Sequence, residues 1–279
     1  MSEQRRVAVV TGASRGVGKG VALALGSQGW RVVVTSRGKD GPSEELSAVA
    51  AEVTARGGDG IAVACDHADD AQVAEVFRRA DAEAGRVDLL VNNVWAGPGF
   101  DRKRFWERPL SDWDTLIGIG LRAHYVASVE AARRMVEAGS GLIVNISSFG
   151  TRAHLHSVLY GMSKAGLDKM AADMAHELRG TGVSALSLWL GLVQTERVLS
   201  APGGTIAGFP VSEAETPEFE GRVIAALADD PAIERRSGHT LISAEVAPEY
   251  GVAEADGRQP GSHRPFFGGG PLFPPAVEG

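Results

Sequence analysis

The chain has 279 residues, of which 44% are hydrophobic, and this is enough for one domain with a sizeable buried core. A formal net charge of -7 and scattered basic residues argue against nucleic acid as a partner. One cysteine, no basic leader before an apolar stretch and no apolar run of about 18 residues lead us to expect a cytoplasmic protein without a membrane partner.

Apolar runs alternate with helical patterns along most of the chain. We expect strands at residues 6–11, 31–35, 60–64, 87–92, 141–147, 183–189 and 239–243. Strands that alternate with helices form a parallel sheet with helices on both faces. The sequence therefore predicts one α/β domain over residues 1–256, built on a doubly wound, seven-stranded parallel sheet in three layers.

Three glycines, Gly12, Gly16 and Gly18, follow the first predicted strand in the sequence TGASRGVG. The next apolar residues have helical spacing, so the glycines lie at a turn from a strand to a helix. Gly12 permits the tight turn, and the other two leave no Cβ between the backbone and a phosphate at the positive end of the helix. The turn predicts a pyrophosphate site; in a chain with 36 glycines, an ordinary turn is the alternative.

The second predicted strand ends in Thr35-Ser36-Arg37. Enzymes that use NAD usually place a carboxylate there, which binds the ribose hydroxyls and repels a 2′-phosphate. Here Ser36 offers a hydroxyl, and Arg37 with Arg15 from the first turn supplies two cations. We therefore expect NADP(H) in preference to NAD(H), with two solvated surface arginines as the alternative.

Polar residues follow two later strands. Asn92 ends the fourth predicted strand, and Ser147 and Ser148 end the fifth. The carboxyl ends of parallel strands lie along one edge of an open sheet, where ligands bind. These side chains are therefore candidates for a ligand site.

Two segments lack a regular period. Residues 95–110, rich in glycine, proline and charge, predict a loop insertion, after which Ser111 is the expected N-cap of a helix that runs to about Gly139. Residues 257–279, rich in glycine and proline, are expected to form an irregular or disordered tail.

Tyr160 and Lys164 lie four residues apart in a helical pattern, so their Cβ atoms are roughly 6 Å apart on one face. A free tyrosine titrates at about pH 10 and is a poor acid-base group at neutral pH. A neighbouring ammonium, helped by the charge of oxidised nicotinamide, lowers the pKa of the phenol. The pair predicts proton transfer beside a nicotinamide; an exposed tyrosine and lysine without a shared role is the alternative.

The motifs TGASRGVG, LVNNVWAG, NISS, YGMSK and WLGLVQT, with Asp66 after the third strand, resemble those of the short-chain dehydrogenase/reductase family over nearly the whole chain. The resemblance implies a Rossmann-type fold and an NADP(H)-dependent oxidoreductase acting on a small carbonyl compound or secondary alcohol. It also implies a substrate lid at residues 195–216 and a homodimer or homotetramer formed through two long helices.

The resemblance implies roles for individual residues. Tyr160 donates a proton, Lys164 lowers its pKa and binds the nicotinamide ribose, and a serine binds the substrate oxygen. Asn92 contacts the adenosine side, and Val193 with Thr195 contacts the carboxamide region. The expected cofactor contacts are Gly12, Ser14, Arg15, Gly16, Val17, Gly18, Ser36, Arg37, Asp66, Asn92, Tyr160, Lys164, Val193 and Thr195.

Two of these assignments have alternatives. Asp66 is expected to contact the adenine, but it could instead cap the next helix. The catalytic serine is Ser148 when it is placed by the end of the strand, and Ser147 when it is counted back from Tyr160. We choose Ser148, because a one-residue deletion in the following loop is easier to accommodate than a shifted strand, which would turn its side chains to the other face.

The sequence departs from the family pattern at two positions. Gly120 stands where an asparagine usually helps to hold a water beside the lysine, and Leu190 stands where a proline usually precedes the next glycine. Weakened proton supply would suit an alternative function, a non-catalytic NADP-binding sensor or scaffold with the same fold. The histidines show no metal-ligand spacing, so no catalytic metal is expected.

Overall fold

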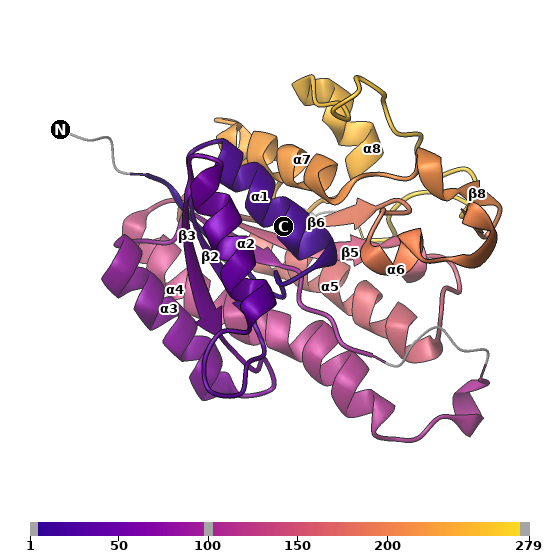
Figure 1. Cartoon of the computed structure of the whole chain (residues 1–279), viewed down its shortest axis with the longest axis horizontal. Helices are drawn as coiled ribbons and strands as arrows, with labels where there is room; N and C mark the ends of the chain where they lie inside the picture. The colour runs from indigo at the N-terminus through magenta and orange to yellow at the C-terminus, as the bar shows by residue number, and fades with distance from the viewer. Residues whose placement is uncertain (1–4, 98–102, 274–279) are drawn as a thin grey trace.

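The computed structural model describes residues 5–97 and 103–273. It confirms the α/β fold, with helices packed around a central sheet (Figure 1). The sheet is doubly wound, parallel and seven-stranded, in the order β3-β2-β1-β4-β5-β6-β9. The strands are β1 (Val7–Val10), β2 (Arg31–Ser36), β3 (Asp59–Ala64), β4 (Leu89–Asn92), β5 (Gly141–Ser148), β6 (Val183–Leu190) and β9 (Thr240–Ile242). All seven expected strands are present, within two residues of their expected bounds.

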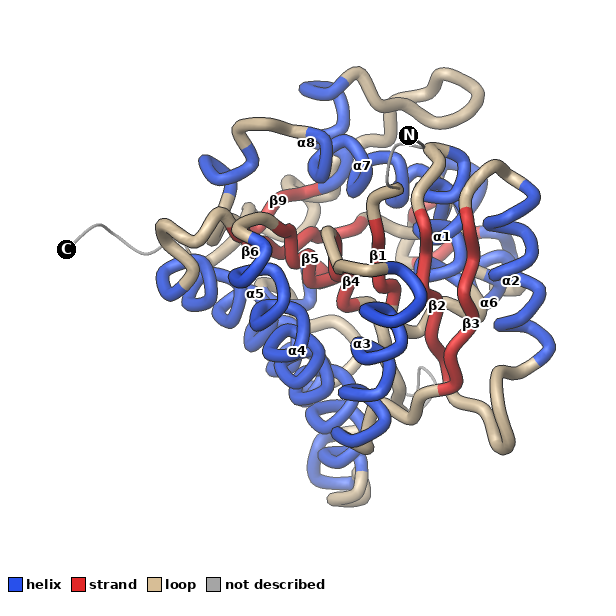
Figure 2. The backbone as a smooth tube through the Cα atoms, turned by 90° about the vertical axis from the view of Figure 1, so that its left-hand side faces the viewer, coloured by secondary structure: helices blue, strands red, loops and turns tan. Residues whose placement is uncertain are grey.

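Helices cover both faces of the sheet (Figure 2). One face packs against α1 (Gly16–Ser27), α2 (Glu44–Ala55) and α7 (Pro217–Asp229), and the other against α3 (Asp70–Ala84), α4 (Ala123–Ala138) and α5 (Val158–Glu177). The strands are buried on both sides, and this explains continuous apolar runs such as VAVV in β1. Within the described part of the chain, no helix is both long enough and apolar enough to cross a bilayer.

The helix expected from Ser111 to Gly139 is present but is wound in two ways. Helical turns begin at residue 112, residues Asp114–Arg122 form a π-helix (η2), and α4 continues to Gly139, whose φ is 72°. Gly118 and Gly120 lie inside η2. A π-helix of this length is uncommon, and π-turns within helices are frequent at functional sites.

The segment expected to be the substrate lid, residues 195–216, is called the lid segment below. It contains α6 (Glu196–Leu199), η4 (Pro202–Gly204), the antiparallel hairpin of β7 (Thr205–Ile206) and β8 (Phe209–Pro210), and η5 (Val211–Glu213). Its base is closed, because Gln194 donates a backbone hydrogen bond to Glu215 (2.8 Å) and Glu215 donates one to Leu192 (2.8 Å). The lid segment therefore leaves the sheet and returns at one fixed point.

The tail is irregular in structure but packed against the domain. After α8 (Ser243–Val246) and η7 (Ala247–Tyr250), residues 257–273 contain no helix or strand. Phe267 stacks on Phe149 with ring centroids 5.0 Å apart, and Arg258 donates to the carbonyl oxygens of Glu213 (2.7 Å) and Ala214 (3.0 Å). The hydrogen bonds of Arg258 hold the C-terminal end of the lid segment. Residues 98–102 of the expected insertion and 274–279 of the tail lie outside the described part.

Candidate active site

Ser148 and Tyr160 meet at the carboxyl edge of the sheet. Ser148 is the last residue of β5, Tyr160 lies in the first turn of α5, and their hydroxyl oxygens are 2.8 Å apart. Ser148 Oγ also accepts a hydrogen bond from the N–H of Gly150 (3.1 Å). This contact leaves the serine hydrogen for Tyr160 or for a substrate oxygen.

The neighbouring serine points away from this pair. The hydroxyl of Ser147 is buried and donates to the carbonyl oxygen of Lys164 (3.3 Å). Side chains alternate along a strand, so consecutive serines at the end of β5 face opposite sides of the sheet. The geometry therefore favours Ser148 over Ser147 as the partner of Tyr160.

Lys164 lies one helical turn after Tyr160 and is 6% exposed. Its Nζ donates to the carbonyl oxygen of Ile146 (2.8 Å) and lies 5.8 Å from the centre of the Tyr160 ring. Burial lowers the pKa of Lys164 to about 8, and the negative charge of Asp168 acts in the opposite direction. The lysine therefore remains mostly an ammonium at neutral pH.

The pKa of Tyr160 corrects an expectation. The sequence predicts that Lys164 lowers it, but in the protein alone burial raises it above its usual value, against the effect of the hydrogen bond with the serine. The ammonium faces Ile146, while the rings of Trp95 and His156 crowd the phenol. Tyr160 is consequently protonated at neutral pH, which is the form that can donate a proton.

Asp168 extends the buried row on α5 and was not expected from the sequence. It is fully buried and accepts hydrogen bonds from Trp189 Nε1 (2.8 Å) and Thr151 Oγ1 (2.9 Å). Burial raises the pKa of its carboxyl group. The recurrence every four residues from Tyr160 through Lys164 to Asp168 is the sequence signal that points to it.

Three side chains, Trp95, His156 and Arg197, lie at or near the Tyr160 ring and are called the rim of the reaction site below. The rings of Trp95 and His156 meet the Tyr160 ring edge-on, with centroids 6.3 Å and 4.7 Å away, and the guanidinium of Arg197 lies 5.8 Å from the centre of the Trp95 ring. His156 has a φ of 61°, which is uncommon outside glycine. Burial, with a contribution from the charge of Arg197, lowers the pKa of His156 to about 4. The rim thus combines two aromatic edges with one permanent cation.

Many of the expected cofactor residues line one cleft of about 380 Å³ beside this site. The expected residues among its lining are Gly12, Ser14, Arg15, Ser36, Arg37 and Asp66. The lining also includes Ser43 and Glu45 from the start of α2, and Val94 and Trp95 after β4. The cleft therefore extends from the ends of the first strands to the rim of the reaction site at Trp95.

Glu45 was not expected in this cleft. Its pKa is lowered by a backbone hydrogen bond at the start of α2, by Ser43 and by the charge of Arg15. The cleft thus contains two carboxylates, those of Glu45 and Asp66, together with the two cations, Arg15 and Arg37, that the sequence predicts there.

The three glycines of the first turn have different structural roles. Gly12 has a φ of 68°, and a Cβ there would lie 2.8 Å from the Cα of Val94. Gly16, with a φ of 57°, is the first residue of α1. A Cβ at Gly18 would lie 2.5 Å from the amide nitrogen of Asn93 and 2.5 Å from the carbonyl oxygen of Gly12. Gly18 therefore allows α1 to approach the end of β4, a packing role that was not expected from the sequence.

The residues expected at the carboxamide region approach the same turn. The methyl carbon of Thr195 would lie 3.4 Å from a Cβ at Gly16, and its hydroxyl oxygen accepts a hydrogen bond from a backbone N–H of α6 (3.4 Å). Val193 is 7% exposed and pairs with Glu215 at the base of the lid segment. Val17 packs against the core next to the turn.

Asn92 corrects another expectation. Its side chain is fully buried, and its amide nitrogen donates to Ser128 Oγ (2.9 Å) and Asn145 Oδ1 (3.0 Å). The side chain therefore faces α4 and β5 and cannot contact the adenosine side. The next residue, Asn93, faces the glycine turn instead and donates to the carbonyl oxygen of Gly12 (3.0 Å).

Asp66 lines the cleft and also makes a local contact. Its Oδ1 accepts a hydrogen bond from the N–H of Ala68 (3.0 Å). The N-cap of α3 is Asp69, whose side chain accepts hydrogen bonds from the N–H groups of Ala71 and Gln72. Asp66 thus supports the turn before the helix, while Asp69 provides the cap.

The two departures from the family pattern lie in well-packed surroundings. At the turn after β6, which lacks the proline, the N–H of Gly191 donates to the buried carboxylate of Glu215 (2.7 Å). At Gly120, a Cβ would lie 3.5 Å from Trp95 Cδ1 and 3.6 Å from Ser163 Oγ. The carboxylate of Glu215 thus anchors the turn after β6. The side chains of Trp95 and Ser163 border Gly120, where the family usually has an asparagine.

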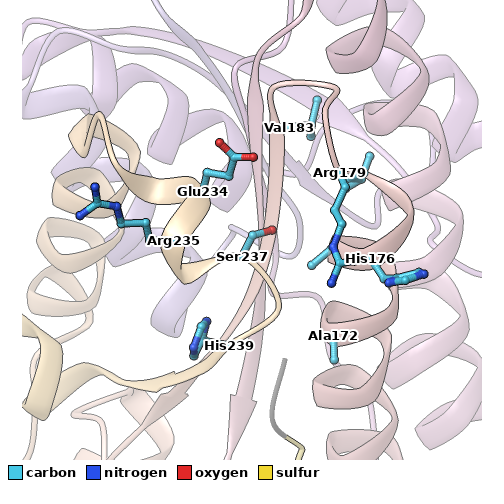
Figure 3. Close-up of a pocket in the computed structure, with 10 residues that line it drawn as sticks. Ala172, His176, Arg179, Val183, Glu234, Arg235, Ser237 and His239 are labelled. Carbon is cyan, nitrogen blue, oxygen red and sulfur yellow. The ribbon is translucent and has the colours of Figure 1, made fainter. Parts of the chain in front are cut away.

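A second hollow, of about 420 Å³, lies away from these residues between the end of α5 and the segment around η6 (Ile233–Arg236) (Figure 3). Arg179 and Ser237 face one another across it, and none of the expected site residues lines it. Among the residues that the structure describes, no group of three or more His, Cys, Asp or Glu side chains is arranged to hold a metal ion.

The fold is that of a short-chain dehydrogenase. A family model described as short chain dehydrogenase matches residues 6–202, and the chain belongs to this family of oxidoreductases. The chain is 45% identical over 267 residues to dehydrogenase/reductase SDR family member 1 of Homo sapiens, a match that covers 91% of this chain and 84% of that protein.

Two solved structures are similar to this fold. A short-chain dehydrogenase/reductase of Serratia marcescens has a TM-score of 0.74 and 29% identity, with coverage of 86% of this chain and 96% of that chain. A metagenomic short-chain oxidoreductase in complex with NADP has a TM-score of 0.66 and 34% identity, with coverage of 81% of this chain and 91% of that chain.

Proposed function

We propose that the protein transfers hydride between NADP(H) and a small carbonyl compound or secondary alcohol, and that it reduces the carbonyl compound at neutral pH. The observation that carries this proposal is the contact of 2.8 Å between the hydroxyl oxygens of Ser148 and Tyr160, with Lys164 one helical turn away. The similarity to an oxidoreductase whose structure contains NADP supports the choice of cofactor.

The residues of the reaction site supply the proton and stabilise charge. When bound, the nicotinamide supplies the hydride that reduces the carbonyl carbon. Tyr160 donates its proton to the carbonyl oxygen, and Ser148 donates a hydrogen bond to the same oxygen, where negative charge develops. The raised pKa of Tyr160 keeps the phenol protonated at neutral pH, as reduction requires. The ammonium of Lys164 then stabilises the tyrosinate until a proton returns from solvent.

Three features of the cleft and the glycine turn support the choice of a phosphorylated dinucleotide. The N–H of Gly16, at the positive end of α1, already binds a negative group, the carboxylate of Glu196 (3.1 Å). Arg15 and Arg37 lie in the same cleft and would hold the 2′-phosphate. Thr195 lies beside Gly16, at the end of the turn that we assign to the nicotinamide half.

Replacement of Arg37 by glutamine is expected to lower kcat/KM for NADPH about ten- to hundredfold, the value of a charge-assisted hydrogen bond. The value for NADH is expected to change little, because only NADPH carries the phosphate that the guanidinium binds. Initial rates with a ketone or aldehyde from a broad panel measure both constants. Arg133→Gln on the exposed side of α4 is the control, and equal wild-type kcat/KM values for the two cofactors would contradict the preference.

The second candidate is a non-catalytic NADP-binding sensor or scaffold, and Gly120 at the place of the usual asparagine is the observation that favours it. The panel of carbonyl compounds separates the two functions. Tight NADPH binding without oxidation by any compound would favour the sensor, whereas turnover would exclude it.

We also propose a homodimer or homotetramer formed through α4 and α5. Both helices carry exposed apolar side chains, Tyr125 and Val136 on α4 and Val158 and Met162 on α5. Exposed apolar side chains on neighbouring helices are typical of interaction surfaces. Sedimentation of the purified protein measures the oligomeric state.

A further inference from the structure

Glu196, the first residue of α6 in the lid segment, contacts the start of α1. The backbone N–H of Gly16 donates to both carboxylate oxygens, with nitrogen-to-oxygen distances of 3.1 Å to Oε2 and 3.3 Å to Oε1. Gly16 is the first residue of α1, and Arg15 before it makes no side-chain capping bond. The carboxylate of Glu196 therefore acts as a cap for α1 from a distant part of the chain.

The contact is suited to being broken. It is exposed to water, so charge and hydrogen bonding contribute little beyond what solvent would provide. α6 has only four residues, and the hydroxyl of Thr195 caps it locally. The base of the lid segment is closed separately by the backbone pairing of Val193 with Glu215. α6 can therefore leave α1 while the base stays in place.

The N–H of Gly16 belongs to the turn that we assign to the cofactor pyrophosphate. A carboxylate and a phosphate cannot occupy the same N–H, and their charges repel one another. We propose that Glu196 is a placeholder for the cofactor phosphate: it ties the lid segment to the cofactor turn in the free protein, and dinucleotide binding displaces it. This inference rests on the proposed function, because it requires a dinucleotide at this turn.

Displacement of Glu196 also changes the rim of the reaction site. Arg197 is the next residue of the same short helix, and its guanidinium lies 5.8 Å from the centre of the Trp95 ring. Trp95 in turn meets the Tyr160 ring edge-on. A movement of α6 therefore moves the guanidinium of Arg197 relative to Trp95. Cofactor binding is in this way coupled to the side chains near Tyr160.

The substitution Glu196→Gln tests the placeholder role, because it removes the charge and keeps the size. Calorimetry on the full chain without substrate is expected to show NADPH binding about two- to fivefold tighter than in the wild type, the effect of one exposed charge at a helix N-terminus. Affinity for adenosine 2′-monophosphate, which lacks the pyrophosphate, is expected to be unchanged. Glu213→Gln, which removes a carboxylate from the other end of the lid segment, is the control and is expected to leave NADPH affinity unchanged.

Hydrogen exchange gives a second readout that needs no cofactor. The amides of residues 196–199 are expected to exchange faster in Glu196→Ala than in the wild type, because alanine, unlike glutamine, offers the Gly16 N–H no side-chain acceptor and α6 is no longer tied to α1. Unchanged exchange would overturn the placeholder role and leave the proposed function intact. The same conclusion would follow if the wild type binds NADPH and Glu196→Gln binds it equally well or more weakly. A wild type that does not bind NADPH would overturn the proposed function, and the placeholder role with it.

Discussion

Replacement of Tyr160 by phenylalanine is expected to lower kcat for carbonyl reduction about a thousandfold. The substitution removes one oxygen atom, which lies 2.8 Å from Ser148 Oγ, and with it the proton donor for the substrate oxygen. The ring that packs edge-on against Trp95 and His156 is retained, so the reaction site keeps its shape and NADPH affinity is expected to change little. NADPH oxidation measures kcat, and calorimetry measures Kd.

Tyr125→Phe is the matched control, because Tyr125 lies on α4 and is 57% exposed. A rate for Tyr160→Phe within about tenfold of the wild-type rate would show that another group supplies the proton.

In the wild type, reduction is expected to decline above about pH 8. The pKa of Lys164 is lowered to about 8, so the ammonium that stabilises the tyrosinate is present below that pH and is lost as the pH rises.

Replacement of Gly150 by alanine is expected to lower kcat about a hundredfold. Gly150 lies in η3 (Phe149–Thr151), directly after the serine, and its φ is not in the left-handed region, so alanine suits its backbone. The added Cβ, however, would lie 2.5 Å from Tyr160 Cε1 and 3.1 Å from Ser148 Oγ. The tyrosine ring has to move, and a displacement of about 1 Å in a catalytic group costs on the order of a hundredfold in rate.

Gly118→Ala is the control for this substitution, because a Cβ at Gly118 meets nothing within 4 Å. Steady-state kinetics, the NADPH Kd and the melting temperature of both variants separate a local effect from loss of the fold. We expect Gly150→Ala to keep its Kd and Tm while kcat falls. Wild-type kcat in Gly150→Ala would mean that the space left by this glycine does not position Tyr160.

The arrangement of the sheet could be predicted from the sequence, but the irregular regions could not. Strands buried on both faces are continuous apolar runs, such as the eight buried residues of β6, and these runs are visible without a structure. The π-helical winding of η2 could not be predicted, because the sequence pattern there has the usual helical period. The hairpin of β7 and β8 has only two residues in each strand, too few for a periodic signal.

The core of the site was likewise accessible to sequence reasoning. Spacing on α5 placed Tyr160 and Lys164 on one face, and the register of β5 favoured Ser148, whose hydroxyl lies next to Tyr160 in the structure. In the protein alone, the pKa of Tyr160 shifts in the direction opposite to the one expected beside nicotinamide, because the sequence shows the nearby cation but not the extent of burial. Asn92 was misplaced for a similar reason, since a residue at a strand end can face either the cleft or the interior.

The site residues that sequence reasoning missed depend on contacts between distant segments. Glu196 reaches Gly16 across 180 positions of the chain, and no local pattern links the two. Glu45 enters the cofactor cleft because α2 begins beside it, and its place depends on the loop after β2. Asp168 is different, because it continues the four-residue spacing of Tyr160 and Lys164 along α5 and could have been found.

Transfer of deuterium from labelled NADPH to a product alcohol tests hydride transfer at this reaction site most directly. The reaction is run with NADPH deuterated at its transferable hydrogen and with a ketone that the wild-type protein accepts. Mass spectrometry is expected to find one deuterium on the carbinol carbon of each alcohol, with one alcohol formed per NADPH consumed. An alcohol without deuterium, or tight NADPH binding with no alcohol formed from any ketone or aldehyde of a broad panel, would contradict the assignment of this protein as a carbonyl reductase.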